Sequence, residues 1–468
     1  MATFSRPENI RAEPLADRVI DRLSAKYSTN WAINNYYPSA TQFRDDVEWN
    51  DYLDSQAGQD DRETPLSLYV QIPFCSDACH FCACDRVVTR ERGVTRRYLQ
   101  ALAKEIELKA NLIGKSRPVR SLHWGGGTPT YLDNAEMTEL MYLVSRCFRL
   151  LSPRLEQHSI ELDPRSLSSA TVALLRGVGF KQIRLGVQDF NPRVQQAIHR
   201  TQSFASIAMH VDAIRDQGFE HLTFDMMYGL PEQNIDSMTD TLDKVVSLAP
   251  DGVAYHPYRH MPEQFSSQRN IDGHRVPGAA TTLKLQLLIG QTLQASGYRL
   301  VGMDHFVLPS DGSPAAQLER SVAQRSLPYA GLMTQDEIGL GLAAISRLGD
   351  YHFQNPTDLQ DYYEQIENKQ LPDFRGHKAS DEDKLRGHII SQLLSDLRLD
   401  LEKCNELFGI DFQAAFKSEL PKLHALEADG LITMDPHHIV VTDQGRPFLA
   451  TICGTFDAYC APLSRGYS

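Results

Sequence analysis

Residues 72–84 read Ile-Pro-Phe-Cys-Ser-Asp-Ala-Cys-His-Phe-Cys-Ala-Cys, directly after a strand-like run at residues 67–72. Cys75, Cys79 and Cys82 stand at positions i, i+4 and i+7 of this segment. One short loop can therefore offer three thiolates, which are soft and charged ligands, to three corners of a cubane iron–sulfur cluster. A structural zinc site would use two separated pairs of ligands, and no second pair accompanies the loop. The spacing predicts a [4Fe–4S] cluster.

Three cysteines leave one iron of such a cluster without a protein ligand. The amino and carboxylate groups of S-adenosylmethionine can chelate that iron, and an electron from the cluster can then break a carbon–sulfur bond. Cys-x3-Cys-x2-Cys is the signature of the radical S-adenosylmethionine superfamily. A fourth cysteine, Cys84, follows at i+9. Because a fourth thiolate would close the open iron, we expect Cys84 to be a small residue beside the loop and not a ligand.

Strand-like and helical patterns alternate along the chain around this loop. Strands are predicted at residues 67–72, 121–124, 159–162, 182–187, 222–225 and 253–256, and helices at 98–112, 135–147, 169–178 and 204–216. This alternation is typical of βα units with a parallel sheet. Six units are too few to close an eight-stranded barrel. We therefore predict an α/β fold with an open, partial (β/α)6 radical S-adenosylmethionine barrel over residues 61–310.

Polar residues and glycines mark the ends of these predicted strands. In parallel α/β folds the chemistry lies at the carboxyl ends of the strands. Five residues stand at or just past such ends, and we expect them to meet at one edge of the sheet: Cys75, Gly125, Glu161, Gln188 and Asp225.

Each of these positions has a functional interpretation and a plainer one. Glycines 125–127 let the backbone approach a ligand closely, and we expect them to hold the methionine amino group, although a lone triple glycine is more often a turn. Glu161 and Asp225 are costly to bury unless they bind a ribose or an ammonium group, and a helix cap is an equal alternative. Gln188 can read adenine or ribose. Arg200 can clamp a carboxylate, but surface solvation is its simpler expectation.

Composition excludes several classes of function. The chain has 468 residues and a net charge of −13, whereas nucleic-acid binding needs concentrated lysine and arginine. Its eight cysteines include four within ten residues, which favours a metal site over a disulfide framework. We see neither a secretory signal nor an apolar run that could span a membrane. The expectation is a cytoplasmic monomer that does not bind nucleic acid.

The C-terminal part of the chain differs in character. Helices are predicted at residues 383–397, 401–408 and 414–429, followed by short strands at 431–434 and 439–442 around a turn. This order indicates a mostly helical, winged-helix-like module over residues 383–468. Its acidic residues favour packing against the barrel over DNA binding. Residues 1–60 are expected to be an N-terminal arm, and 311–382 a linking segment packed on the barrel.

Several blocks of the sequence together carry a family resemblance. They are residues 68–70 (Leu-Tyr-Val), the cysteine loop, the block 123–132, residues 186–191 (Gly-Val-Gln-Asp-Phe-Asn), residues 228–231 (Tyr-Gly-Leu-Pro) and residues 302–306 (Gly-Met-Asp-His-Phe). The chain resembles the oxygen-independent coproporphyrinogen III oxidases from about residue 37 to its end.

The resemblance implies a reaction and a set of cofactor contacts. Such enzymes convert coproporphyrinogen III, a tetrapyrrole, to protoporphyrinogen IX in haem synthesis without oxygen, and a 5′-deoxyadenosyl radical removes a hydrogen from each of two propionates in turn. A reductant protein such as a flavodoxin or a ferredoxin supplies the electron. Two S-adenosylmethionine molecules are implied. By matching positions the first contacts Tyr69, Gly126, Glu161 and Ile345, and the second contacts Phe81, Gly127, Thr128, Gln188, Arg200, Asp225 and Arg259.

The chain departs from the family pattern at four places, which are Gln71, Ile33, Arg259 and the block 330–334. Two alternatives therefore stay open: a radical S-adenosylmethionine enzyme with another tetrapyrrole reaction, such as methyl transfer or ring opening, and a haem chaperone without turnover. His305 would be the haem ligand of a chaperone, although an internally hydrogen-bonded histidine is the simpler expectation. Candidate partners of the substrate propionates are Arg18, Arg22, Arg44 and Arg86.

Overall fold

The fold is built on six neighbouring parallel strands. The computed structural model describes residues 17–27, 37–56, 65–151, 157–309, 336–372 and 375–459. The six strands, in the spatial order β9-β8-β7-β6-β4-β1, are β1 (Leu66–Ile72), β4 (Pro118–Gly126), β6 (Gln157–Leu162), β7 (Gln182–Gln188), β8 (His221–Tyr228) and β9 (Gly252–Pro257). All six coincide with predicted strands, which confirms the partial (β/α)6 barrel.

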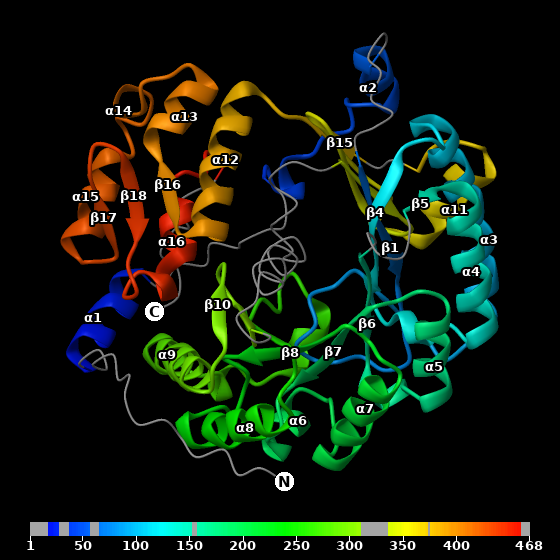
Figure 1. Cartoon of the computed structure of the whole chain (residues 1–468), viewed down its shortest axis with the longest axis horizontal. Helices are drawn as coiled ribbons and strands as arrows, with labels where there is room; N and C mark the ends of the chain where they lie inside the picture. The colour runs from blue at the N-terminus through cyan, green and yellow to red at the C-terminus, as the bar shows by residue number, and fades with distance from the viewer. Residues whose placement is uncertain are drawn as a thin grey trace.

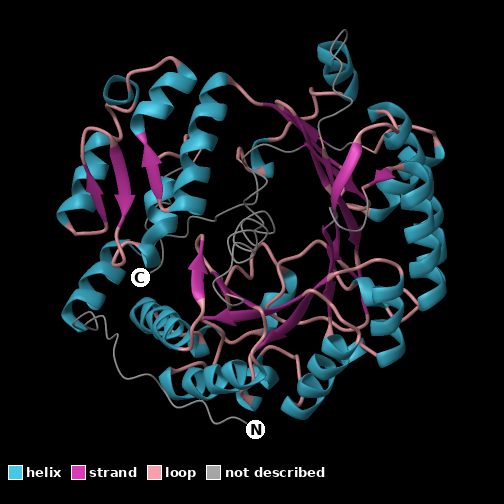
Figure 2. Cartoon of the chain, in the orientation of Figure 1, coloured by secondary structure: helices cyan, strands magenta, loops and turns pink. Residues whose placement is uncertain are grey.

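Helices cover the outer face of this sheet. They are α3 (Gly93–Ile113), α4 (Asn134–Cys147), α5 (Ser169–Gly177), α6 (Pro192–Ala197), α7 (Phe204–Asp216), α8 (Ile235–Leu248) and α9 (Ala279–Ala295). Figures 1 and 2 show the sheet as an open arc with these helices along its outside. Leu66, Leu68, Val70 and Ile72 of β1 are buried in the core between sheet and helices. The other face of the sheet, which carries the alternate residues of each strand, lines the inside of the arc.

Short strands extend the sheet beyond both ends of the six. β12 (Asp336–Leu340) lies parallel to β1, and β13 (Ile345–Leu348), β14 (Tyr351–Gln354) and β15 (Arg375–Lys378) continue from it antiparallel. At the other end β11 (His305–Val307) and β10 (Arg299–Val301) follow β9. The sheet path runs from β10 to β15 without closing. Smaller elements accompany it, namely α2 (Trp49–Gln56), β2 (Phe74–Cys75), β3 (Val87–Val88), β5 (Arg149–Leu150) and α11 (Leu359–Glu367).

The C-terminal module combines helices with a small sheet in the order β16-β18-β17. Its elements are α12 (Asp381–Asp396), β16 (Arg398–Asp400), α13 (Leu401–Phe408), α14 (Phe412–Ala415), α15 (Leu420–Ala428), β17 (Ile432–Met434), β18 (His438–Val441) and α16 (Leu449–Gly454). The single helix predicted over residues 414–429 is wrong. It breaks after Ala415 because Pro421 lacks an N–H and is tolerated only in the first turn of α15.

The module packs against the barrel, as expected. Leu283 of α9 and Val301 of β10 belong to the same buried cluster as Ile389 and Leu393 of α12. The first described helix, α1 (Asp17–Tyr27), joins this contact, since Tyr27 Oη donates a 2.6 Å hydrogen bond to Asp429. Within the described ranges, no helix combines the length and apolar character needed to cross a lipid bilayer.

Candidate active site

Polar side chains line the inside of the arc. Ser121 of β4 donates a 2.7 Å hydrogen bond to Ser67 of β1, and His123 of β4 is hydrogen-bonded to Ser159 of β6 at 2.7 Å. Tyr69 stacks on His123 with ring centroids 5.7 Å apart. A closed (β/α)8 barrel fills its interior with branched apolar side chains. The polar lining here instead suits a polar ligand.

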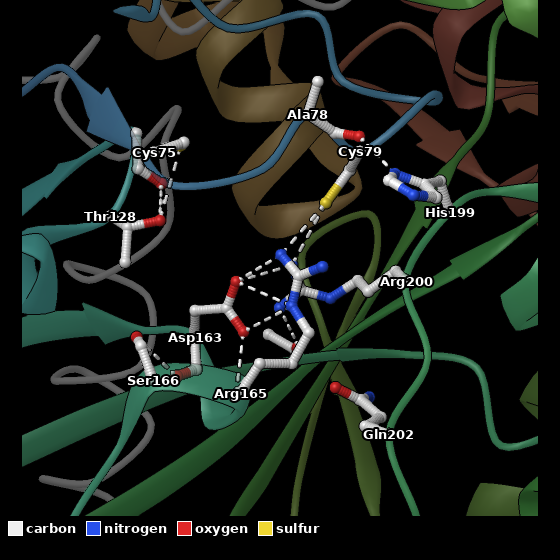
Figure 3. Close-up of polar contacts among 12 residues, drawn as sticks. Cys75, Ala78, Cys79, Thr128, Asp163, Arg165, Ser166, His199, Arg200 and Gln202 are labelled. Atoms are coloured by element: carbon white, nitrogen blue, oxygen red, sulfur yellow. Dashed lines mark hydrogen bonds and ion pairs between the residues drawn. The ribbon is translucent and has the colours of Figure 1, made fainter. Parts of the chain in front are cut away.

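The cysteine loop is tied down over the carboxyl end of this lining. Phe74, which precedes Cys75, is fully buried between Tyr98 and Tyr131, with centroids 5.2 and 5.5 Å away. Further along, the backbone N–H of His80 donates to the Ile198 carbonyl at 3.0 Å. Cys75 Sγ lies 3.4 Å from Thr128 Oγ1. Figure 3 shows Cys75 beside Thr128, and Cys79 beside Arg165, Arg200 and Asp163.

Cys79 lies against two arginines and an aspartate (Figure 3). Arg200 is 6% exposed, and its guanidinium donates to Cys79 Sγ at 3.3 Å and to Asp163 Oδ2 at 3.0 Å. Its second terminal nitrogen donates to the Gly186 carbonyl at 2.6 Å. Surface solvation, the simpler expectation for Arg200, is therefore wrong. The carboxylate and the carbonyl at neighbouring strand ends replace the water that this guanidinium gives up.

The three thiols fit the chemistry of a cubane cluster. In the described ranges, no three His, Cys, Asp or Glu side chains converge on a single ion. A cubane does not require such convergence, because each thiolate binds a different iron. A hydrogen bond from Cys84 is the largest of the influences that together lower the pKa of Cys82 to about 6, which favours the thiolate. Burial raises the pKa of Cys75, because the surrounding protein disfavours the charged thiolate.

The glycine segment touches both the cysteine loop and Glu161. A Cβ on Gly127 would lie 2.7 Å from the Pro73 carbonyl carbon, so only glycine fits beneath the loop. Gly126 has a φ of +106°, a conformation that favours glycine, and its N–H donates to Glu161 Oε2 at 3.4 Å. The other oxygen of Glu161 lies 3.2 Å from His123 Nε2. The strand ends therefore bring Glu161 and the glycines together, as predicted.

Asp225 lies inside β8, three residues before its end, so its predicted position at the strand end is wrong. The buried strand continues through Met226 and Met227 to Tyr228. Asp225 accepts a 2.6 Å hydrogen bond from Arg184 and lies 3.8 Å from His256. His256 also contacts Asp304 at 3.0 Å. Burial alone would lower the pKa of His256, but its bonds to the two carboxylates raise it to about 9.

This raised pKa predicts a pH dependence of stability. A histidine whose pKa rises on folding contributes stability in full below its ordinary value of 6.5, and that contribution disappears as pH rises through about 9. The unfolding temperature of the apo chain should therefore contain a component that falls between pH 6.5 and 9. His256→Gln should remove this component, which thermal unfolding in steps of pH measures. Superimposable profiles of the wild-type and His256→Gln chains would contradict the assignment.

The remaining candidate residues fall into two groups along the sheet. Tyr69 pairs with Gly339 of β12, and Gly339 lies against the backbone of Ile345. Tyr69 and Ile345 therefore belong with Gly126 and Glu161 to a first group, toward the β1 end of the sheet. Gln188 ends β7 with a φ of +68°, beside Arg200 and Asp225 on the other side. Arg259 follows β9, and burial lowers its pKa. Phe81 packs on the cluster of Val194, Ile198, Leu230, Tyr258 and Ile271.

Sequence reasoning missed the charged residues that face the interior: Asp163, Arg165, Arg184, His256 and Asp304. Arg184 and Asp225 are neighbours across β7 and β8, and alternation along the strands would have placed both on the inner face. Their pairing depends on register, which no local pattern shows. His305 is buried and hydrogen-bonded to Asp304 at 2.7 Å, which confirms the simpler expectation for it.

The four arginines considered for the propionates are scattered. Arg22 pairs with Asp429 of the C-terminal module at 2.7 Å, and Arg18 is exposed on the same helix. Arg44 forms a β-bridge with Gly376. Arg86 donates to the Cys79 carbonyl at 3.3 Å, so it is the member of this set beside the cysteine loop. Of the departures from the family pattern, Ile33 and residues 330–334 lie outside the described residues.

Comparison with known proteins places the chain in a class and then in a family. The model of the radical S-adenosylmethionine superfamily matches residues 69–245, and that of the HemN C-terminal domain matches residues 379–448. The chain is thus a radical S-adenosylmethionine protein, which implies a [4Fe–4S] cluster and S-adenosylmethionine.

Full-length relatives define the family. The oxygen-independent coproporphyrinogen III oxidase of Pseudomonas aeruginosa is 38% identical over 431 residues, covering 92% of this chain and 93% of that protein. The Escherichia coli enzyme is 36% identical over 443 residues, covering 95% and 96%. The solved structure of coproporphyrinogen III oxidase from Escherichia coli superimposes with a TM-score of 0.83, covering 92% of this chain and 98% of that one. The chain belongs to the oxygen-independent coproporphyrinogen III oxidases.

Proposed function

We propose that this chain converts coproporphyrinogen III to protoporphyrinogen IX without oxygen. Each of two propionates loses a hydrogen atom, an electron and CO2, which leaves a vinyl group. The observation that carries the proposal is the placement of the three-cysteine loop above a polar barrel interior. Gly127 lies against the loop backbone, and its neighbour Gly126 is hydrogen-bonded to Glu161. This arrangement occurs in a chain related to the named oxidases over more than nine-tenths of its length.

Cys75, Cys79 and Cys82 hold the cluster in this proposal. When bound, the cluster and S-adenosylmethionine supply one-electron cleavage chemistry that produces an oxidising carbon radical. The chain's own residues position and enclose these groups. Gly127 lets the glycine segment lie directly under the loop, and Phe81 packs on an apolar cluster. Apolar packing beside the site would help to exclude water and other quenchers of a radical.

Two S-adenosylmethionine molecules would occupy the two groups of residues on the sheet. The first would contact the group on β1, β4, β6 and β13: Tyr69, Gly126, Glu161 and Ile345. The second would contact the other group together with the loop residues, which are Phe81, Gly127, Thr128, Gln188, Arg200, Asp225 and Arg259. Gln188 of β7 and Asp225 of β8 lie on the far side of β6 from the strands of Tyr69 and Gly126, and this separation along the sheet supports two sites.

A one-electron carrier of the flavodoxin or ferredoxin type would reduce the cluster. A polar cavity of about 520 Å³ beside the cysteine loop offers an approach. His80, which lies between two of the cluster cysteines, lines it together with Arg193, Glu232, Asp272 and Arg275.

The test is anaerobic incubation of the reconstituted chain with coproporphyrinogen III, S-adenosylmethionine and a reductant. Protoporphyrinogen IX formed together with 5′-deoxyadenosine is the expected result. Another tetrapyrrole product would instead assign a different radical reaction, and stable haem binding without turnover would assign a chaperone. Either result would overturn the proposal.

Glu161→Gln should weaken the binding of S-adenosylmethionine about 10- to 150-fold, since a charge-assisted hydrogen bond is worth roughly 1.5–3 kcal/mol. The substitution keeps the shape of the side chain and removes its charge. Glu107→Gln is the matched control, because Glu107 pairs with Arg146 on the outer surface. Equilibrium binding to the reconstituted chain measures the effect. An unchanged dissociation constant would remove Glu161 from the site.

A further inference from the structure

The three cluster cysteines have unequal surroundings. Cys79 Sγ accepts hydrogen bonds from two guanidinium groups, from Arg200 at 3.3 Å and from Arg165 at 3.4 Å (Figure 3). Cys75 Sγ has the neutral hydroxyl of Thr128 as its neighbour. Among these described contacts, the hydrogen bonds from positively charged groups are made to Cys79 Sγ.

Asp163 fixes both guanidinium groups in place. Arg165 donates to its carboxylate from Nε at 3.0 Å and from Nη2 at 2.6 Å, while Arg200 donates at 3.0 Å. The backbone N–H of Arg165 also donates to Asp163 at 2.9 Å. Arg165 Nη2 and Arg200 Nη1 thus each contact Asp163 and Cys79 together. Arg165 and Arg200 carry two positive charges and Asp163 carries one negative charge, so the three side chains together place a net positive charge beside the sulfur.

We propose that Asp163 and Arg165, together with Arg200, raise the reduction potential of the cluster through Cys79. The inference rests on the proposed function, in which Cys79 is a cluster ligand. Reduction by one electron from the external carrier adds one negative charge to the cluster. Hydrogen bonds to a ligand sulfur stabilise this more negative state more than the oxidised state, which is one of the ways that proteins set the potential of iron–sulfur clusters.

Burial strengthens this effect. The side chain of Arg200 is 7% exposed, that of Asp163 11% and that of Arg165 25%. Electrostatic interactions are stronger in such a site than in water. Arg165 and Asp163 act in this account as positioning residues that tune the cluster, and neither is assigned a contact with substrate.

The test is the midpoint potential of the cluster in the full reconstituted chain, followed by electron paramagnetic resonance during a redox titration. Arg165→Gln should shift the potential to a more negative value. At a fixed ambient potential the ratio of reduced to oxidised cluster should fall about tenfold, which corresponds to about 59 mV for one electron. Arg90→Gln is the matched control. Arg90 pairs with Asp77 of the same loop at 2.5 Å, but its side chain is 79% exposed, so the potential should stay unchanged.

A second measurement uses the wild-type chain alone. Electron–nuclear double resonance of the reduced cluster, compared in H2O and D2O, should show exchangeable protons coupled to the cluster. Their absence would overturn the inference, as would an Arg165→Gln shift no larger than that of Arg90→Gln. If Arg165→Gln loses its cluster, the wild-type spectrum decides. A wild-type chain without any cubane signal would instead contradict the proposed function, so the two failures are distinguishable.

Discussion

Replacing Cys79 with alanine is expected to remove the [4Fe–4S] cluster and with it all oxidase activity. Cys79 is buried and is one of the three proposed cluster ligands on a single loop. A cubane held by two thiolates would expose a second iron and lose its anchorage. Iron and sulfide content per chain, together with the cluster's absorption and paramagnetic resonance spectra, measure the loss. Activity should fall below the limit of detection.

Cys404→Ala is the control for this substitution. Cys404 is also a buried free cysteine, but it lies in α13 of the C-terminal module. This variant should keep its full iron content and its activity. A Cys79→Ala chain that retained a normal cluster and normal turnover would contradict the assignment of the loop.

Replacing Glu105 with alanine is expected to destabilise the fold by about 3–5 kcal/mol, the usual cost of leaving one partner of a buried ion pair uncompensated. Glu105 and Lys109 are both 0% exposed and lie 2.8 Å apart on α3. Glu105 also accepts hydrogen bonds from the Gly341 N–H at 2.8 Å, from Tyr362 at 2.7 Å and from Asn355 at 2.7 Å. Its loss would leave the buried Lys109 ammonium group with neutral oxygen acceptors, the Gly339 carbonyl and Asn355 Oδ1, in place of a carboxylate. The Gly341 N–H and the Tyr362 hydroxyl would lose their acceptor.

Chemical denaturation of the apo chain measures this effect. Glu107→Ala, two residues along the same helix, is the matched control because Glu107 is half exposed in its pair with Arg146. It should change stability by less than about 0.5 kcal/mol. Equal denaturation midpoints for the Glu105→Ala and Glu107→Ala chains would show that the buried network contributes nothing.

Much of the fold could be predicted from the sequence because its signals are local. Buried parallel strands alternate with amphipathic helices, and α7 of the barrel and α13 of the C-terminal module have the predicted bounds. The strands β12 to β15 were missed. They are four or five residues long, and what defines them is pairing with one another and with β1, more than 260 positions earlier in the chain. Propensity in a short window carries no information about such partners.

The same division holds for the candidate site. The cysteine spacing and the glycines are readable because each is a run of neighbouring residues. The grouping of Asp163, Arg165 and Arg200 around Cys79 could not be predicted, since these four residues come from three separate loops. Arg200 was expected to be solvated at the surface. Asp225 was recognised, but its partners Arg184 and His256 come from the strands on either side. The cysteine loop and the glycine segment could therefore be singled out from the sequence, whereas the charged side chains that contact Cys79 and Asp225 could not.

The most direct test of the account uses coproporphyrinogen III carrying deuterium at the β-carbons of the propionates. The reconstituted chain is incubated anaerobically with this substrate, S-adenosylmethionine and a reductant, and the 5′-deoxyadenosine formed is examined by mass spectrometry. We expect deuterium to appear in 5′-deoxyadenosine while vinyl groups form on the tetrapyrrole. Vinyl product accompanied by unlabelled 5′-deoxyadenosine, or no vinyl product from a chain with a full cluster, would contradict it.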